Sequence, residues 1–185
     1  MCVRGYHEAI NYSFVNKDMD NQISGQESKL ELLNPISTEM AVMKSSHLAG
    51  LLQTLKRNLS RQNNRIRLFE IGNVFSGDIK NHKEVEKIAA IAIGSIEEES
   101  WNTKHNDISF FDLKGDLDSL LLSNNEKDFF SYESNSDNKN FHPSYSADIY
   151  RKGEIIGVIG KLNPILTRHF DISEDVYFFE IDYKK

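Results

Sequence analysis

The sequence predicts an α+β fold in which an antiparallel sheet is flanked by helices. About seven stretches carry the apolar patterns of strands, whereas only three or four have the spacing of helices. Several predicted strands follow one another directly after residue 128, and Lys152-Gly153 between two of them indicates a hairpin turn. A doubly wound α/β fold needs a regular alternation of strands and helices, which the second half of the chain lacks.

Length and composition are those of an ordinary globular chain. Its 185 residues, 39% of them hydrophobic and 27% charged, can enclose a core, and we expect one domain over residues 1–185. No apolar run is long enough to span a membrane, and the N-terminus lacks the pattern of a signal peptide. The single cysteine, Cys2, excludes an internal disulfide and fits a reducing compartment, so a cytoplasmic location is expected.

A leucine-faced helix is the clearest element. It is predicted from Ser46 to Arg61, with Ser45 and Ser46 able to cap its first turn. Asn63-Asn64 breaks the helix, and Arg65 to Ile71 reads as a strand that ends at Gly72. The leucines of the buried face are Leu48, Leu51, Leu52, Leu55 and Leu59.

The segments before this helix are shorter and more polar. Arg4 to Phe14 reads as a helical turn followed by a strand, because Ile10, Tyr12 and Phe14 alternate with other residues. Val15 to Gln26 predicts a short helix and a loop, with Gly25 as the stop signal.

Two further strands and a connection are predicted around the helix. Leu30 to Leu33 is a brief strand, and Ser76 to Glu86 reads as a charged connection. Lys87 to Gly94 contains a continuous apolar run, which is typical of a central strand that is buried on both faces.

The second half begins with another helix. Asp112 is a predicted N-cap, the apolar stripe comprises Leu113, Leu117, Leu120 and Leu121, and Asn124 to Lys127 ends the helix. Later, Asn163-Pro164 opens a short helix. The predicted strands after the second helix are Asp128–Glu133, Ala147–Tyr150, Ile155–Gly160 and Val176–Tyr183.

Spaced motifs along almost the whole chain share one pattern. They include Asn34-Pro35-Ile36-Ser37, Met43-Lys44-Ser45-Ser46, Gly50-Leu51-Leu52, Phe69-Glu70-Ile71-Gly72-Asn73-Val74-Phe75, and Trp101 with Phe110-Phe111-Asp112-Leu113-Lys114-Gly115-Asp116-Leu117. Together, from Gly5 to Tyr183, they resemble the core module of the bacterial phenylalanyl-tRNA synthetase beta subunit. The resemblance implies a class II aminoacyl-tRNA synthetase-like fold. It also implies a fragment of a longer chain, because nothing here resembles the editing, tRNA-binding or anticodon-binding modules.

The resemblance to class II enzymes also implies where phosphate-binding arginines would lie. One would follow the strand that ends at Phe75, but Ser76 stands there, and the segment Gly157–Pro164 has no arginine at the needed offset. Arg168 lies further on. We therefore expect no catalytic and no cofactor-binding residues in this chain, although the holoenzyme would use ATP and magnesium.

Other chemistry has little support. The six histidines lack metal-ligand spacing, so no metal site is predicted, and Cys2 has no activating neighbour. Asp112, Asp116 and Asp118 are read as a helix cap and a solvated face rather than as catalytic carboxylates. A second hypothesis stays open: an active ligand-binding domain of the same fold, such as an ATP-dependent ligase. The missing arginines favour a structural module instead.

The net charge of −6 hides a basic segment. Six of the 22 basic residues and no acid lie between Lys44 and Phe69, which leaves 16 basic against 28 acidic residues elsewhere. This segment is either a solvated helix face or a surface for RNA phosphate or an acidic protein.

The resemblance implies two partners, the catalytic alpha subunit and, in the holoenzyme, tRNA, with no membrane. We expect the alpha subunit to dock on an apolar surface around the leucine helix, which would also give the free chain a route to self-association. The predicted interface residues are Met40, Met43, Lys56, Arg57 and Arg61.

Overall fold

A computed structural model describes residues 1–28, 30–98, 100–101, 106–121 and 130–183. Its helices are η1 (Cys2–Arg4), α1 (Lys17–Ser24), η2 (Thr38–Met40), α2 (Leu48–Leu59), α3 (Phe110–Leu121) and α4 (Pro164–His169). Its strands are β1 (His7–Glu8), β2 (Phe14–Val15), β3 (Val42–Met43), β4 (Ile66–Gly77), β5 (His82–Ile93), β6 (Phe130–Ser134), β7 (Phe141–Arg151), β8 (Glu154–Leu162) and β9 (Tyr177–Asp182).

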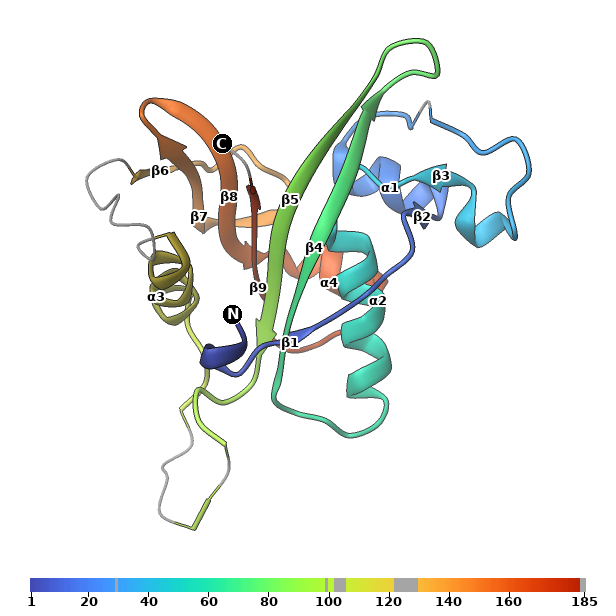
Figure 1. Ribbon diagram of the computed structural model, residues 1–185. Coiled ribbons are helices and arrows are strands. Elements are labelled where there is room, and N and C mark those ends of the chain that lie inside the picture. The colour runs from blue at the N-terminus through green and yellow to red at the C-terminus, as the bar shows by residue number, and fades with distance from the viewer. Residues whose placement is uncertain (29, 99, 102–105, 122–129, 184–185) are drawn as a thin grey trace.

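One large sheet organises these elements (Figure 1). Seven strands follow the order β1-β4-β5-β9-β8-β7-β6, while β2 and β3 pair separately. The α+β class is confirmed, but the prediction of an antiparallel sheet is wrong at one edge. There β1 runs parallel to β4, with His7 opposite Leu68, so the sheet is mixed.

Helices cover both faces of the sheet (Figure 1). The leucines of α2 pack on one face together with α1 and α4, and α3 packs on the other face. Strand β5 lies between β4 and β9, and alternate residues such as Ile91 and Ala90 enter the two different cores. The continuous apolar run is thus a central strand buried on both faces, as predicted.

The sequence prediction fails at the hairpin between β4 and β5. The predicted strand Arg65–Ile71 continues to Gly77, and the predicted connection Ser76–Glu86 comprises the end of β4, the turn and the start of β5. Gly77 has a positive φ of 93°, and the Asp78 carboxylate accepts hydrogen bonds from the turn amides of Lys80 and Asn81. The hairpin extends beyond the main body of the sheet (Figure 1). Because its outer part has no core to pack against, its sequence is charged and lacks the alternating apolar pattern of a half-buried strand.

Three smaller predictions need correction. Residues 10–13 form no strand, and Leu30–Leu33 provides only an isolated bridge between Glu31 and Val42. Asp112 is not the N-cap of α3. It lies inside the first turn, where its carboxylate accepts hydrogen bonds from the amide and hydroxyl of Ser109.

The remaining elements follow the sequence closely. The α1 helix ends at Gly25 in a left-handed conformation, and Asn163 caps α4 through the amide of Ile165. Lys152-Gly153 joins β7 to β8, and β7 is longer than predicted because it begins at Phe141. The predicted helix end at Asn124–Lys127 and the start of the strand at Asp128 lie outside the described residues. Within the described part, none of the helices has the length and apolar character needed to cross a membrane.

Candidate subunit interface

Helix α2 presents a fully buried face and an exposed cationic face. Leu51, Leu52 and Leu55 have no exposed area, whereas Lys56 and Arg57 in the last turn are exposed. The Ser46 hydroxyl accepts a hydrogen bond from the amide of Leu48, which satisfies one free donor at the helix start, as the sequence predicted. Basic residues in the last turn interact favourably with the negative end of the helix dipole.

The structure divides the basic segment of the sequence into paired and unpaired cations. Three of its members form ion pairs with acids from elsewhere in the fold: Lys44 with Glu70 (2.6 Å), Lys56 with Asp171 (2.6 Å) and Arg67 with Asp116 (3.1 Å). Among the described residues, Arg57 and Arg61 have neither an ion pair nor a hydrogen-bonding side-chain partner. These two exposed guanidinium groups are therefore available to a partner.

Arg57 borders a groove whose walls are both apolar and polar, since Glu39 and Gln53 also line it. Ile10, Tyr12 and Met40 line the groove together with Arg57. Ile10 is 93% exposed and Tyr12 is 64% exposed, which is unusual for two large apolar side chains on neighbouring positions of one extended segment. We call the set Ile10, Tyr12, Met40 and Arg57 the groove surface.

The segment that carries Ile10 and Tyr12 is anchored at both ends. The Ala9 amide donates to the carbonyl of Phe69 (2.7 Å), and the Ser13 carbonyl accepts from the amide of Lys44 (2.9 Å). Between these anchors, the backbone groups of residues 10–12 make no hydrogen bonds within the described part of the chain. The segment thus has a fixed path together with unpaired backbone donors and acceptors.

Asn11 holds the middle of this segment against α2. Its side chain donates to Glu70 (2.7 Å) and accepts from the hydroxyl of Thr54 on α2 (2.8 Å). The close approach depends on Gly50, where an added Cβ would lie 3.0 Å from the Cβ of Asn11. Because Asn11 points inward, its neighbours Ile10 and Tyr12 face the solvent.

A buried polar cluster supports the same region. The Glu70 carboxylate is in contact with Lys44 Nζ (2.6 Å) and lies 3.2 Å from His47 Nδ1. His47 Nε2 donates to the carbonyl of Gly72, which lies 3.2 Å away. Burial by itself raises the pKa of Glu70, but the contacts with His47, Asn11 and Lys44 outweigh this and hold it below its usual value.

A second carboxylate fixes the start of α2 from the opposite end of the chain. Glu180 on β9 accepts hydrogen bonds from the His47 amide (2.8 Å) and the Ser46 hydroxyl (3.0 Å). Lys87 on β5 contacts the other oxygen of the same carboxylate at 3.1 Å. A negative charge at a helix N-terminus is stabilising, so this contact positions α2 on the sheet.

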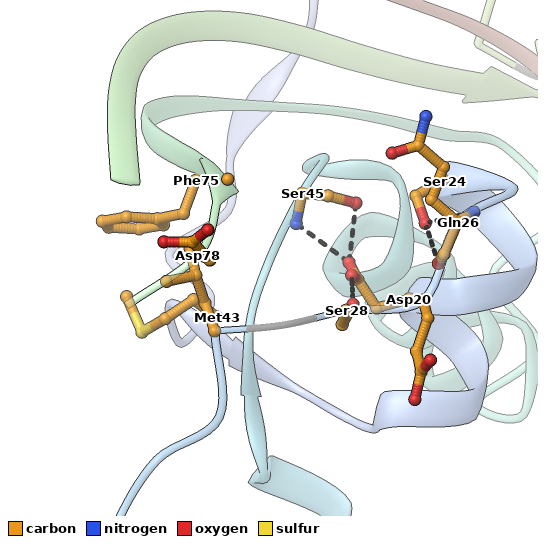
Figure 2. A pocket seen from close by; sticks show the side chains of 11 residues that line it. Asp20, Ser24, Gln26, Ser28, Met43, Ser45, Phe75 and Asp78 are labelled. Atoms are coloured by element: carbon orange, nitrogen blue, oxygen red, sulfur yellow. Dashed lines mark hydrogen bonds between the residues drawn. The ribbon is translucent and has the colours of Figure 1, made fainter. Parts of the chain in front are cut away.

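Met43 lies apart from the groove surface. It lines a different hollow, which Figure 2 shows together with Phe75, Asp78 and Asp20. On one side of this hollow the Asp20 carboxylate accepts from the amide (2.9 Å) and hydroxyl (2.7 Å) of Ser45 and from the Ser28 hydroxyl. Asp20 therefore fixes the segment before α2, and Met43 lines a different hollow from Met40 and Arg57.

The positions where phosphate-binding arginines would lie, but are missing, are either exposed or required for packing. Ser76 is exposed on the β4–β5 hairpin, and Arg168 is exposed on α4. An added Cβ at Gly157 would lie 2.2 Å from the carbonyl oxygen of Glu180, and one at Gly160 would lie 2.5 Å from the Phe141 ring. These two glycines are thus required by packing within the sheet.

The three aspartates of α3 have three different sets of partners. Asp112 contacts Ser109, Asp116 contacts Arg67, and Asp118 pairs with Lys114 on the same helix at 2.8 Å. Among the described residues, no group of three or more His, Cys, Asp or Glu side chains is arranged to hold a metal ion.

Sequence reasoning missed the outward-facing residues Ile10 and Tyr12 and the anchoring roles of Asn11 and Glu180. The alternation around Ile10 and Tyr12 was visible, but it indicated a strand rather than a segment pinned to a helix. No local signal predicts that Glu180 contacts a helix start that lies 133 positions earlier.

Comparison with known proteins gives consistent matches. The family model described as "Phenylalanyl tRNA synthetase beta chain CLM domain" matches residues 1–183. Phenylalanine–tRNA ligase beta subunits are similar throughout: that of Wigglesworthia glossinidia brevipalpis is 36% identical over 181 residues, and that of Nitrosococcus oceani is 38% identical over 179 residues. Each alignment covers 96% of this chain but only 22% of the relative, so the chain spans about a fifth of their length.

Proposed function

Because the chain belongs to the phenylalanyl-tRNA synthetase beta chain family, we propose that it is a non-catalytic structural module that supports assembly with a catalytic alpha subunit. In this proposal the complete enzyme charges tRNA with phenylalanine, and this module contributes a docking surface. The mixed sheet with helices on both faces supports a class II synthetase-like fold, which is the second part of the proposal.

The groove surface carries the proposal. Two large apolar side chains, Ile10 and Tyr12, are held outward on an anchored segment next to Arg57, which is an unpaired cation in the described structure. An apolar centre with an arginine at its border is the composition that protein interfaces favour. An anchored surface also loses little conformational freedom when it binds, which favours a stable complex.

The residues present do not fit a site for ATP and magnesium. Such a site needs cations for the phosphates and free carboxylates for the metal ion. Of the buried carboxylates, Glu70, Asp116 and Glu180 are each held by a cation of the chain itself, and Asp20 accepts hydrogen bonds from Ser45 and Ser28. The two arginine positions discussed above are not filled. We therefore derive no chemical step in this chain.

Co-purification tests the assembly proposal. The chain, co-expressed with a tagged phenylalanyl-tRNA synthetase alpha subunit, should elute with it as a stoichiometric complex in gel filtration. Recovery of the alpha subunit without the chain would contradict the proposal. An ATP–pyrophosphate exchange assay on the chain alone separates this hypothesis from an independent ligase, because exchange above background would favour the second.

A further inference from the structure

Three arginines converge at a corner of the fold where η1, the start of β4 and the helix α3 meet. Arg67 donates to Asp116 at 3.1 Å, and Arg4 approaches the other oxygen of the same carboxylate at 3.4 Å. Arg65 and Arg67 both donate to the carbonyl of Ile96, at 3.2 and 3.1 Å. We call Arg4, Arg65 and Arg67 the arginine corner.

The acceptors of this corner are already in use. Asp116 also accepts a hydrogen bond from the hydroxyl of Tyr6 at 2.9 Å, and both lone pairs of the Ile96 carbonyl are occupied by guanidinium groups. Arg4 has one further partner, the hydroxyl of Ser119. The Asp116 carboxylate therefore contacts two of the three guanidinium groups, those of Arg4 and Arg67, and Arg65 contacts a neutral carbonyl.

Many donors remain without an acceptor. Each guanidinium offers five N–H groups, and the Nε atoms of Arg65 and Arg67 are buried without a hydrogen-bond partner in the described part of the chain. Arg67 is only 6% exposed, but the side chain of Arg4 is 50% exposed, so the corner is open to solvent on the Arg4 side. Surplus donors and surplus positive charge are the complement of an oxyanion.

From this arrangement we propose that the arginine corner binds a phosphate group. Arg67 is held by Asp116, whereas Arg4, through Nη1 and Nη2, and Arg65, through Nη2, each use only part of their five N–H groups. The remaining N–H groups can donate charge-assisted hydrogen bonds to a phosphate. Gly5 lies beside Arg65, since an added Cβ there would be in ordinary contact with Arg65 Nη2 at 3.6 Å. The phosphate belongs either to an RNA backbone or to a free phosphorylated molecule.

This site is independent of the groove surface. Asp116 belongs to α3, and Tyr6 packs in the core on the α3 side of the sheet, whereas α2 covers the opposite face (Figure 1). The proposal therefore does not depend on assembly with an alpha subunit.

The test is a titration of the chain with two probes, inorganic phosphate and a short RNA duplex, followed by heteronuclear NMR. We expect saturable shifts of the Gly5 amide and of the Arg65 and Arg67 Nε–H signals with at least one probe. Arg65→Gln and Arg4→Gln should each weaken that binding roughly tenfold, which corresponds to about 1.4 kcal/mol. Arg168→Gln, which removes an exposed arginine of α4, is the matched control and should bind normally.

The two probes distinguish the sources of the phosphate. If RNA binds, the logarithm of its binding constant is plotted against the logarithm of the salt concentration. A slope that is smaller in magnitude by about 0.7–0.9 in Arg65→Gln than in wild type indicates a contact with the RNA backbone. Binding of phosphate without RNA indicates a free phosphorylated ligand. Thermal melts confirm that each variant is folded. The shifts of the Nε–H signals are measured on the wild-type chain and therefore do not depend on the folding of any variant. Absence of saturable binding by both probes, or equal weakening in Arg168→Gln, would overturn the proposal.

Discussion

The carboxylate of Glu180 accepts a hydrogen bond from the backbone amide of His47 at 2.8 Å, which ties the last strand to the first turn of α2. Glu180 is 6% exposed and His47 is fully buried, so water does not replace this contact readily. The pair orients the helix that supports the groove surface. Its removal is the most direct way to loosen α2 without changing the apolar core.

We expect Glu180→Ala to lower the free energy of unfolding by about 1–3 kcal/mol, because the buried amide of His47 and the part-buried hydroxyl of Ser46 lose their acceptor. Lys87 also loses a partner that now lies at 3.1 Å. Urea unfolding measures the change. Glu154→Ala, on an exposed position of β8, is the control and should stay within about 0.5 kcal/mol of wild type. Equal stability of both variants would mean that Glu180 does not anchor α2.

The leucine face of α2 predicts a larger effect. Leu52→Ala and Leu55→Ala should each destabilise the fold by about 2–5 kcal/mol, because both side chains have no exposed area and leave a cavity. Leu33, which is 95% exposed, provides the matched control Leu33→Ala. Chemical denaturation of the three variants checks the prediction, which fails if the buried and exposed substitutions have the same effect.

Gly50 is predicted to control the path of the segment with Ile10 and Tyr12. In Gly50→Ala the new methyl group would lie 3.0 Å from Asn11 Cβ, so the segment must shift away from α2. We expect faster hydrogen exchange than in wild type at the amides of Ala9 and Lys44, which donate to the carbonyls of Phe69 and Ser13. Gly115→Ala on α3, where an added Cβ meets nothing within 4 Å, should leave these rates unchanged. Unchanged exchange rates in Gly50→Ala would show that the contact between Gly50 and Asn11 tolerates the added methyl group without a shift of the segment.

Glu70 predicts a loss of stability in acid. Its folded pKa lies below the ordinary value of 4.5, so folding favours the ionised form. The resulting stabilisation is present above the unfolded pKa and is lost as the pH falls through the folded pKa. The free energy of unfolding, measured from pH 6 to pH 3, should therefore fall less steeply in Glu70→Gln than in wild type. Identical pH dependence of the free energy of unfolding in the two proteins would show that the ionisation of Glu70 does not contribute to the loss of stability in acid.

The sequence predicted elements whose signals are local, and it missed those set by distant contacts. The leucine spacing of α2 and the apolar run of β5 are properties of the segments themselves. The long β4–β5 hairpin was read as a connection because its exposed outer part, around Ile79 and Lys80, has no buried face to impose a pattern. The parallel pairing of His7 with Leu68 depends on chain topology, which short patterns do not encode.

The interface residues illustrate the same limit. Arg57 and Met40 were identified from charge and composition, and the structure places both beside one groove. Lys56 was indistinguishable from Arg57 by sequence, yet it pairs with Asp171 across 115 positions. Ile10 and Tyr12 were assigned to a strand because nothing local reveals that Asn11 between them is bound by Glu70 and Thr54.

The central claim is that the groove surface docks a phenylalanyl-tRNA synthetase alpha subunit. Its most direct test is the dissociation constant of the complex, measured by calorimetry for wild type, Ile10→Ser/Tyr12→Ser and Arg57→Glu/Arg61→Glu. We predict that the apolar double variant weakens binding by at least roughly a hundredfold, or about 2.7 kcal/mol, and that the charge reversals weaken it less and in a salt-dependent way. Circular dichroism controls for folding. Wild-type affinity in the folded apolar double variant would contradict the account.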